Sequence, residues 1–276
     1  MRSILIAGGD MRQVRLAEML RDRGYTVHIA GFDKLGTADD WPAAVDWVFL
    51  PVPYRTPEGD IKAPFSGEKL LLDDIAVRYP LSAFMLGGLD PSAEAALKGR
   101  RLFDILNDEA FLVYNAILTA QGAVCAYLKE SETALCGARC VVTGYGRIAK
   151  LLGGLLKAHA AKVTVVARKY SDLEVIRAEG MTALHISALD KSFQNADVIF
   201  NTVPERIFGE KELKNIPAHT RVIELASPPY GMDIARAREM GLDVRIEASL
   251  PGRYFPASAA GAMLRAFERE EGQHGT

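Results

Sequence analysis

A glycine-rich turn between an apolar run and an amphipathic segment constrains this chain more than any other feature. The stretch from Cys140 to Ala149 reads CVVTGYGRIA, in which Gly144, Gly146 and Ala149 have the spacing G-x-G-x-x-A. The first glycine allows a tight turn, the second lets a pyrophosphate approach the backbone, and the alanine lets helix and strand pack closely. The helix that follows offers free N–H groups and its positive dipole end to phosphate. We therefore expect a dinucleotide-binding unit; the alternative is a similar fold without a cofactor.

The next strand of that unit, residues 163–166, is followed by two cations instead of a carboxylate. NAD-specific sites usually have Asp or Glu at this point, which accepts from the ribose 2′-hydroxyl. Arg168 can instead hold a 2′-phosphate through paired, charge-assisted hydrogen bonds, so the sequence predicts NADP. An ordinary charged loop is the alternative. The expected cofactor-binding residues are Gly144, Gly146, Arg147, Ile148, Ala167, Arg168, Lys169, Thr202, Val203 and Pro204.

Length and composition exclude several classes of protein. The 276 residues suffice for one large or two medium domains, and 49% hydrophobic with 25% charged residues is typical of a soluble globular protein. A net charge of -2 without a dense cluster of Lys and Arg argues against nucleic-acid binding. We expect no membrane span, no signal peptide and a cytoplasmic location. The three cysteines lack paired or C-x-x-C spacing, which favours reduced thiols and no metal site.

Alternating apolar strands and helices predict the architecture. Strands are expected at 3–7, 26–30, 46–50, 81–86 and 101–106, and, around the Gly144 turn, at 140–143, 163–166, 182–186, 197–200, 221–225 and 242–246. Asn107 is the expected N-cap of a long helix. We predict an α/β fold of two doubly wound, Rossmann-like parallel sheets with a cleft between them, joined by that helix. The expected domains are 1–106, facing the substrate; 107–130, the connecting helix; 131–256, binding NADP; and 257–276, a helix packing back on the first domain.

Glycine pairs follow two strands of the first domain. Ligands of an open parallel sheet lie beyond the carboxyl ends of its strands, and backbone N–H groups there can form anion nests. Arg12, in the first turn of a helix, is expected to pair with a carboxylate; a tight turn with a solvated Arg is the alternative. Polar residues of the long helix face either the cleft or solvent. The expected substrate-binding residues are Gly8, Gly9, Arg12, Gly87, Gly88, Thr119, Gly122 and Arg253.

A general base is not evident in the sequence. None of the five histidines follows a strand with a carboxylate partner, so structural or surface roles are expected for them. Asp10 is the candidate base; the alternatives are that it caps the following helix, or that the proton goes to water or to a second protein chain. Asn201 and Ser227 follow the two central strands and are the polar groups expected nearest the nicotinamide. The expected catalytic residues are Asp10, Asn201 and Ser227.

Six motifs lie in order along nearly the whole chain: Gly8-Gly9-Asp10 with Arg12, Asn115-Ala116-Ile117 with Thr119-Ala120-Gln121-Gly122-Ala123, Gly144-Tyr145-Gly146-Arg147, Asn201-Thr202-Val203-Pro204, Leu225-Ala226-Ser227-Pro228 and Leu250-Pro251-Gly252. Together they resemble the family of dipicolinate synthase A-subunits. That family is itself similar in architecture to the D-2-hydroxyacid and alanine dehydrogenases. This chain departs from the family pattern at Gln121, Leu118 and Arg253, where the family tends to have Glu, Pro and Lys, and in reading PASAA at 256–260.

The resemblance implies a function in spore formation. It implies NADP-linked oxidation of a dihydro- or hydroxy-tetrahydrodipicolinate to dipicolinate, pyridine-2,6-dicarboxylate, together with a small flavoprotein-like second subunit. A homo-oligomer is also expected. The alternatives are an enzyme like shikimate or alanine dehydrogenase, and a regulatory subunit that binds the nucleotide without doing chemistry.

Overall fold

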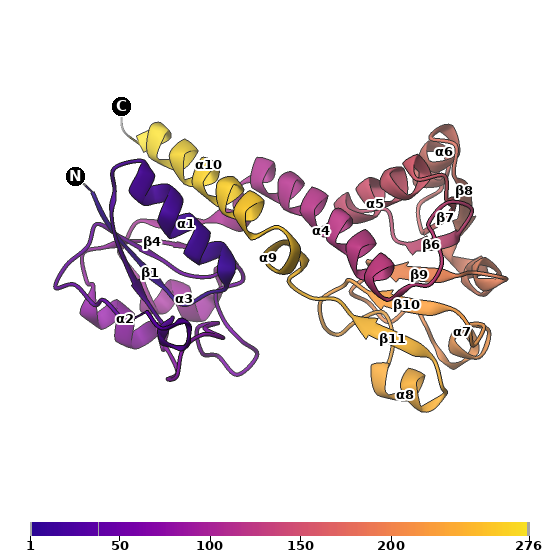
Figure 1. Ribbon diagram of the computed structural model, residues 1–276, viewed down its shortest axis with the longest axis horizontal. Helices are drawn as coiled ribbons and strands as arrows, with labels where there is room; N and C mark the ends of the chain where they lie inside the picture. The colour runs from indigo at the N-terminus through magenta and orange to yellow at the C-terminus, as the bar shows by residue number, and fades with distance from the viewer. Residues whose placement is uncertain (1, 38, 275–276) are drawn as a thin grey trace. The chain divides into compact units, whose positions relative to one another are not determined.

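The computed structural model describes residues 2–37 and 39–274, and the chain divides into two compact units. One unit comprises Met1–Asn115 with Pro251–Thr276, and the other comprises Ala116–Leu250. Each unit is built on a parallel sheet with helices against it (Figure 1). The predicted α/β class with two parallel sheets is therefore confirmed.

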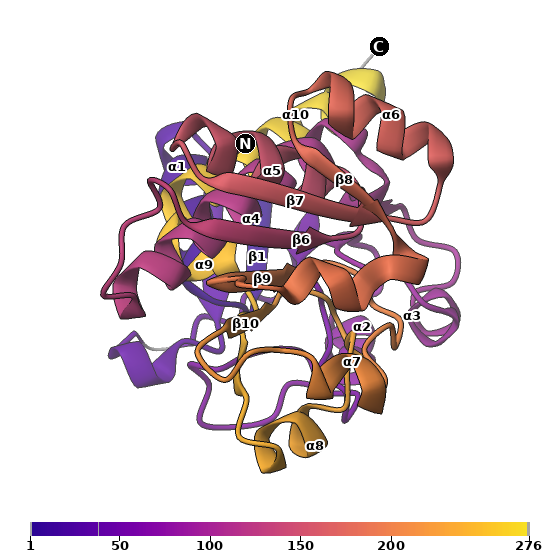
Figure 2. The same cartoon turned by 90° about the vertical axis from the view of Figure 1, so that its right-hand side faces the viewer.

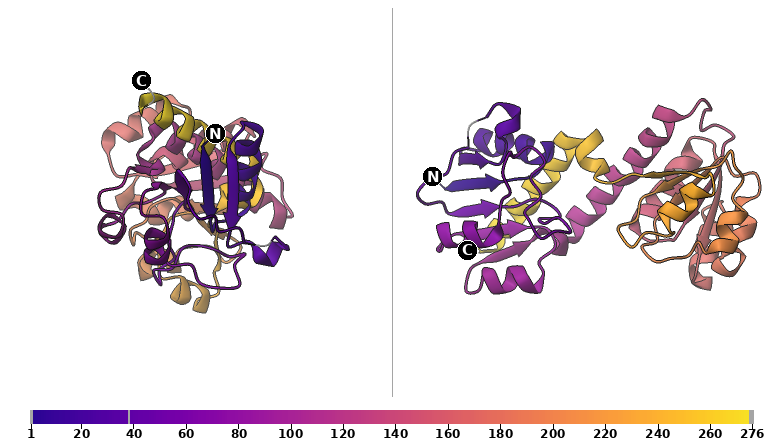
Figure 3. Two further views of the ribbon diagram at one scale, coloured as in Figure 1. Left: turned by 90° about the vertical axis from the view of Figure 1, so that its left-hand side faces the viewer. Right: turned by 90° about the horizontal axis from the view of Figure 1, so that it is seen from below.

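The sheet of the first unit has five strands in the order β2-β1-β3-β4-β5, all paired in parallel. Figure 3 shows its strands β1 and β2, in indigo, from two further sides. All five strands lie where the sequence predicts them. Their bounds are β1 Ser3–Ala7, β2 Thr26–Ala30, β3 Trp47–Phe49, β4 Ala83–Leu86 and β5 Leu102–Asp104, with short 3-10 turns at Asp33–Leu35 and Ile105–Asn107.

Alternating side chains of β1 divide the core of this unit into two layers. Ile4 and Ile6 point to a cluster on the face covered by α1 (Met11–Asp22) and α10 (Pro256–His274). Leu5 and Ala7 point to the opposite cluster, which α2 (Leu72–Arg78) and α3 (Pro91–Ala96) cover. Because both faces of a parallel sheet are buried, its strands are apolar at nearly every position.

The last helix of the chain returns to the first unit. Helix α10 lies along α1 (Figure 1). It places Phe267 edge-on against Phe49 and Trp47, with ring centroids 4.8 Å and 5.3 Å away. Such edge-to-face aromatic pairs contribute beyond the area that they bury. The first unit is thus completed by residues more than 200 positions distant in sequence.

The sheet of the second unit has six parallel strands in the order β11-β10-β9-β6-β7-β8. The strand order reverses beside β6. In doubly wound sheets, ligands bind in the crevice beyond the carboxyl ends of the strands at such a reversal. Figure 2 shows β7, β6, β9 and β10 side by side. The strands are β6 Arg139–Thr143, β7 Lys162–Ala167, β8 Thr182–His185, β9 Val198–Asn201, β10 Arg221–Glu224 and β11 Asp243–Ile246; the helices are α5 Arg147–Ala158, α6 Tyr170–Ala178, α7 Glu210–Lys214 and α8 Ile234–Glu239, with a 3-10 segment at Ile186–Phe193.

Three details differ from the sequence expectations. The long helix α4 (Glu109–Glu130) is capped by Asp108, whose Oδ1 accepts from Phe111 N at 2.7 Å, and not by Asn107. The division between units falls inside α4, and Pro251 onward belongs to the first unit, so the domain bounds differ from those expected. A short helix, α9 (Leu250–Tyr254), lies in a stretch where the sequence predicts no helix.

Helix α4 is the one described helix that is long and apolar enough to cross a membrane. Half of that apolar window is buried inside the protein. Core helices of soluble proteins meet the same criterion of length and composition, so this is weak evidence for a span.

Candidate active site

The predicted glycine turn has the geometry that its sequence suggests. Gly144 follows β6 with φ +92°, and Gly146 is the N-cap of α5. A β-carbon at 144 would lie 2.6 Å from Thr202 Oγ1, whereas one at 146 would meet no described atom within 4 Å. Among the described residues no side chain caps α5. The first turn of α5 therefore offers N–H groups to an anion, with open space beside Gly146 for its approach.

A cavity of about 280 Å³ lies at this turn, wholly within the second unit. Of the expected cofactor residues, Gly144, Gly146, Ala167, Arg168, Lys169 and Val203 line it. Arg147 and Pro204 are exposed outside this lining, and Ile148 and Thr202 are half-buried outside it. Sequence reasoning did not include the other residues of the wall, which are Tyr145, Val166, Asp172, Ile186, Glu205 and Ile207.

The charges of this cavity are mixed. Arg168 and Lys169 are exposed at its wall, as an NADP site requires, but Asp172 and Glu205 line it as well. His185 fixes the backbone of the cationic segment, because its Nε2 lies 3.0 Å from the Arg168 carbonyl oxygen. Its ring also stacks on Tyr170, with centroids 4.9 Å apart.

The structure corrects the expectation that Asn201 faces the nicotinamide. Its side chain is wholly buried, and its Oδ1 accepts from Thr143 Oγ1 at 2.6 Å and from Val203 N at 3.1 Å. Its Nδ2 donates to Val203 O at 3.0 Å and to both oxygens of Glu224, at 2.7 Å and 2.9 Å. Asn201 is therefore a structural residue beneath the site and does not present its amide to a ligand.

Glu224 is a wholly buried carboxylate that sequence reasoning missed. Besides Asn201, it accepts from the backbone N–H groups of Ala226 at 2.9 Å and Gly231 at 3.0 Å. Burial raises the pKa of Glu224, although these hydrogen bonds act in the opposite direction. The signal available in the sequence was an acidic residue within the apolar strand RVIEL. Ser227, the other polar group expected near the nicotinamide, is exposed in the turn that Glu224 holds.

The glycine pairs of the first unit do not form anion nests. Gly8 N donates to Ala30 O at 2.9 Å, and Gly9 N donates to Lys62 O at 2.8 Å. Gly87 N donates to Pro51 O at 3.2 Å, and Gly88 N donates to Asp104 Oδ1 at 3.0 Å. All four amides are thus occupied within the protein, which corrects their assignment as substrate donors.

The buried Arg12 and the half-buried Asp10 form an ion pair with each other. Arg12 Nε and Nη2 lie 2.9 Å from the two carboxylate oxygens, and Nη2 also donates to Val52 O at 2.8 Å. Asp10 is also the N-cap of α1. Burial tends to raise the pKa of Asp10, but the hydrogen bonds and positive charge of Arg12 outweigh burial and hold that pKa below its ordinary value. Because a general base needs a pKa near the working pH, this carboxylate is a poor one, contrary to expectation.

Lys62 lies beside this pair and was not among the expected residues. Burial first, and the positive charge of Arg12 second, lower the pKa of its ammonium group. Gly252 of α9 packs directly on the pair, since a β-carbon there would lie 2.8 Å from Asp10 Oδ2. The first unit thus gathers one carboxylate and two cations at the carboxyl edge of its sheet.

The remaining substrate candidates lie on two elements. Arg253 is exposed on α9, and its Cζ lies 5.3 Å from the centre of the Tyr254 ring. Thr119 is half-buried and Gly122 is buried on α4, in the second unit. No cluster of potential metal ligands occurs among the residues that the structure describes.

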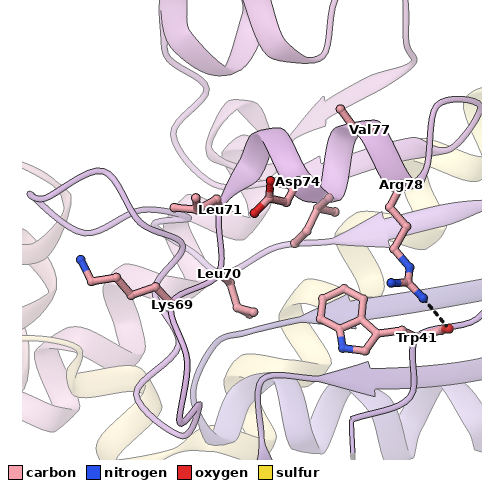
Figure 4. A pocket seen from close by; sticks show the side chains of 8 residues that line it. Trp41, Lys69, Leu70, Leu71, Asp74, Val77 and Arg78 are labelled. Carbon is pink, nitrogen blue, oxygen red and sulfur yellow. Dashed lines mark hydrogen bonds between the residues drawn. The ribbon is translucent and has the colours of Figure 1, made fainter.

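A further cavity, of about 320 Å³, lies on the first unit beside α2 and includes none of the expected site residues (Figure 4). The Arg78 guanidinium donates to the carbonyl oxygen of Trp41 at 3.0 Å, and its Cζ lies 5.4 Å from the centre of the Trp41 ring. The arginine and indole thus hold each other at the rim.

Two family models match the chain, and the residues that they match correspond largely to its two units. Residues 3–105 match the family of N-terminal domains of the dipicolinate synthase A-subunit. Residues 114–228 match the D-isomer specific 2-hydroxyacid dehydrogenase, NAD binding domain. The transhydrogenase of Sinorhizobium meliloti, 15% identical with a TM-score of 0.67 over 96% of this chain and 92% of that one, shares the fold.

Two relatives resemble the chain from end to end. The dipicolinate synthase A-subunit of Bacillus subtilis (strain 168) is 26% identical over 98% of this chain and 98% of its own length. The crystal structure of the same A-subunit from Bacillus halodurans is 27% identical, with a TM-score of 0.84 over 97% of both chains. Residues 3–105 thus resemble the N-terminal domain of that protein, and residues 114–228 resemble a dehydrogenase-type NAD-binding domain. The resemblance predicted from the motifs is therefore confirmed: the chain is similar along its whole length to the A-subunit of dipicolinate synthase.

Proposed function

We propose that this protein is the NADP-dependent oxidoreductase subunit that forms dipicolinate from a dihydro- or 4-hydroxy-tetrahydrodipicolinate precursor in sporulation. The observation that carries the proposal is the end-to-end similarity to the dipicolinate synthase A-subunit. The dehydrogenase-type match of residues 114–228 supports an oxidoreductase that uses a nicotinamide dinucleotide. The cavity at Gly144 and Gly146 supports a dinucleotide site in the second unit.

The donor groups of that cavity fit a dinucleotide phosphate. The uncapped first turn of α5 would hold the pyrophosphate, with Gly146 leaving room for it. Arg168 and Lys169 would hold the 2′-phosphate, which favours NADP over NAD. When bound, NADP⁺ supplies a hydride acceptor. The protein contributes positioning, because hydride transfer requires the donor carbon and the nicotinamide to be held together.

The balance of the reaction limits what the side chains must do. A dihydrodipicolinate becomes dipicolinate by losing one hydride and one proton; a 4-hydroxy-tetrahydro precursor also loses one water. Aromatisation provides driving force, so the proton acceptor can be weak. Lys62 is the acceptor that we propose in place of Asp10, because it lies beside the Asp10–Arg12 pair at the carboxyl edge of the sheet, where burial lowers the pKa of its ammonium group. Ser227 remains a candidate for contact with the nicotinamide side.

Cations of the first unit would hold the two carboxylates of the substrate. Arg253 is the proposed direct partner, while Arg12 supports the site through its bonds to Asp10 and Val52. Thr119 and Gly122 of α4 remain proposed substrate contacts. The enzyme would work in the cytoplasm as a homo-oligomer, with the dipicolinate synthase B-subunit as its flavoprotein-like partner.

A protein that binds NADP without catalysis is the second candidate. It is favoured by one observation, the engagement of Asp10 in an ion pair with Arg12. An enzyme like shikimate or alanine dehydrogenase remains the alternative for the substrate.

The test is turnover of the defined precursor. Purified protein, alone and with its partner subunit, is incubated with enzymatically generated 4-hydroxy-tetrahydrodipicolinate and NADP⁺. We expect NADPH absorbance and the ultraviolet spectrum of dipicolinate to rise in equal amounts. Tight NADPH binding without turnover under any of these conditions would favour the non-catalytic role.

A further inference from the structure

Three neighbouring strands of the second unit end in three wholly buried polar residues. Thr143, Asn201 and Glu224 are the last residues of β6, β9 and β10, and they are paired in register across the sheet. Figure 2 shows these three strands side by side. Their side chains are bonded in the same order: Thr143 Oγ1 donates to Asn201 Oδ1, and Asn201 Nδ2 donates to Glu224. We call these three residues the lateral ladder. A fully bonded buried network of this kind specifies one arrangement of the groups around it.

The lateral ladder holds the two turns that follow its strands. Asn201 binds both the N–H and the carbonyl group of Val203. Glu224 binds Ala226 N through Oε1 and Gly231 N through Oε2. Gly231 O in turn accepts from Ile207 N at 2.9 Å and Phe208 N at 3.0 Å. The segment 202–208 is thereby fixed at both ends.

That segment forms a wall of the dinucleotide cavity. Val203, Glu205 and Ile207 line it, and Thr202 lies against Gly144, where even a β-carbon would be 2.6 Å from its hydroxyl oxygen. Glu224 itself does not line the cavity. It is nevertheless connected to the glycine turn through Asn201 and the segment 202–203.

We infer that Glu224, as a carboxylate, is a positioning residue for dinucleotide binding, acting through Asn201 and the turn 225–231 on the cavity wall. This inference rests on the proposed function. A carboxylate is required because each of its oxygens accepts from a different backbone N–H group. A carboxamide has only one acceptor oxygen, so it would leave one buried N–H group facing an NH₂ group.

The test measures the dissociation constant for NADPH in variants of three buried polar residues of the second unit. Glu224→Gln should raise it by about tenfold or more, the effect of losing one hydrogen bond to a charged group. Thr143→Val, which removes one neutral bond of the lateral ladder, should raise it by roughly threefold. Thr220→Val is the matched control, since buried Thr220 donates at 2.6 Å to Ala196 O just before β10 begins. It should change the constant less than about twofold.

The sign of the effect separates positioning from simple electrostatics. Glu224→Gln removes a negative charge near a site for a polyanion, and Coulomb's law alone predicts tighter binding. Weaker binding by a variant that retains the wild-type circular dichroism spectrum therefore reports displacement of the wall.

Each outcome decides the question. Wild-type affinity in folded Glu224→Gln would overturn the positioning role while leaving the dinucleotide site intact. If that variant does not fold, equal constants for Thr143→Val and Thr220→Val would overturn the role, and selective weakening by Thr143→Val would support it. A wild-type protein that binds neither NADPH nor NADH would overturn the proposed function, and this inference with it.

Discussion

Gly144 and Thr202 approach each other so closely that the position of a β-carbon at 144 lies 2.6 Å from Thr202 Oγ1. Gly144 also has φ +92°, a conformation that favours glycine. Gly144→Ala should therefore destabilise the protein by roughly 1–3 kcal/mol and weaken NADPH binding by at least about tenfold. Chemical unfolding and fluorescence titration with NADPH measure the two effects.

Gly154 provides the control for that substitution. It lies inside α5, and a β-carbon there would meet no described atom within 4 Å. Gly154→Ala should stabilise the protein by up to about 1 kcal/mol and leave the affinity for NADPH unchanged. Equal losses of affinity in both variants would contradict the role given to the Gly144 turn.

Arg168 should discriminate between the two nicotinamide cofactors. Arg168→Asp removes charge-assisted bonds to the 2′-phosphate, each contributing roughly 1.5–3 kcal/mol, and adds repulsion. The dissociation constant for NADPH should rise far more than that for NADH. Arg177→Asp makes the same charge change at an exposed position of α6 and should affect both cofactors little. A similar rise for NADPH and NADH in Arg168→Asp would rule out the 2′-phosphate contact.

Asp10 should stabilise the first unit in a way that depends on pH. Its folded pKa is held below the ordinary value of 3.8, so the stabilisation is present above that pH and is lost as the pH falls through the folded pKa. Asp10→Asn leaves Arg12 without its carboxylate and should cost about 3 kcal/mol at pH 7. Urea unfolding at pH 7, 5, 4 and 3 should show a smaller loss of stability in acid for Asp10→Asn than for wild type. Parallel curves would mean that the pair contributes no such dependence.

Lys62 should affect turnover without affecting the cofactor. Lys62→Met removes the proposed proton acceptor, so kcat/KM for the precursor should fall by at least about a hundredfold. The affinity for NADPH should be unchanged. Lys69→Met is the matched control, because Lys69 is an exposed lysine of the same loop, paired with Asp60 at 2.6 Å. If Lys62→Met turned over normally, the proton acceptor would have to lie elsewhere.

The sheets and the glycine turn were predictable because their causes are local. Apolar runs such as 140–143, a Gly-x-Gly turn and an amphipathic helix report the same structure from contiguous residues. The polar contacts were not predictable for the opposite reason. The amide of Gly9 is occupied by the carbonyl of Lys62, and the Asn201 side chain by a carboxylate 23 residues later. The sequence pattern around a polar residue at the end of a strand is the same whether its side chain is exposed or is buried under a turn.

The ion pair of Asp10 and Arg12 illustrates the same limit. Both residues lie where a base and an anion partner are expected, at the carboxyl edge of a parallel sheet. Because they are two residues apart, the Arg12 guanidinium can bind the Asp10 carboxylate and leave neither group for a ligand or a proton. Gly252, which packs on the pair, is far away in sequence. The location of these two side chains was therefore evident from the sequence, whereas their structural role as an ion pair was not.

Oxidation of a dihydrodipicolinate precursor with NADP⁺ is the activity that we propose for this chain. The most direct measurement is a stoichiometric assay with the protein, its partner subunit, enzymatically generated precursor and either NADP⁺ or NAD⁺. We expect one NADPH to form per dipicolinate, at a rate that is higher with NADP⁺ than with NAD⁺ and at least about tenfold lower in Arg168→Asp. Dipicolinate formed at the same rate with and without either nucleotide, or NADPH formed without dipicolinate, would contradict this proposal.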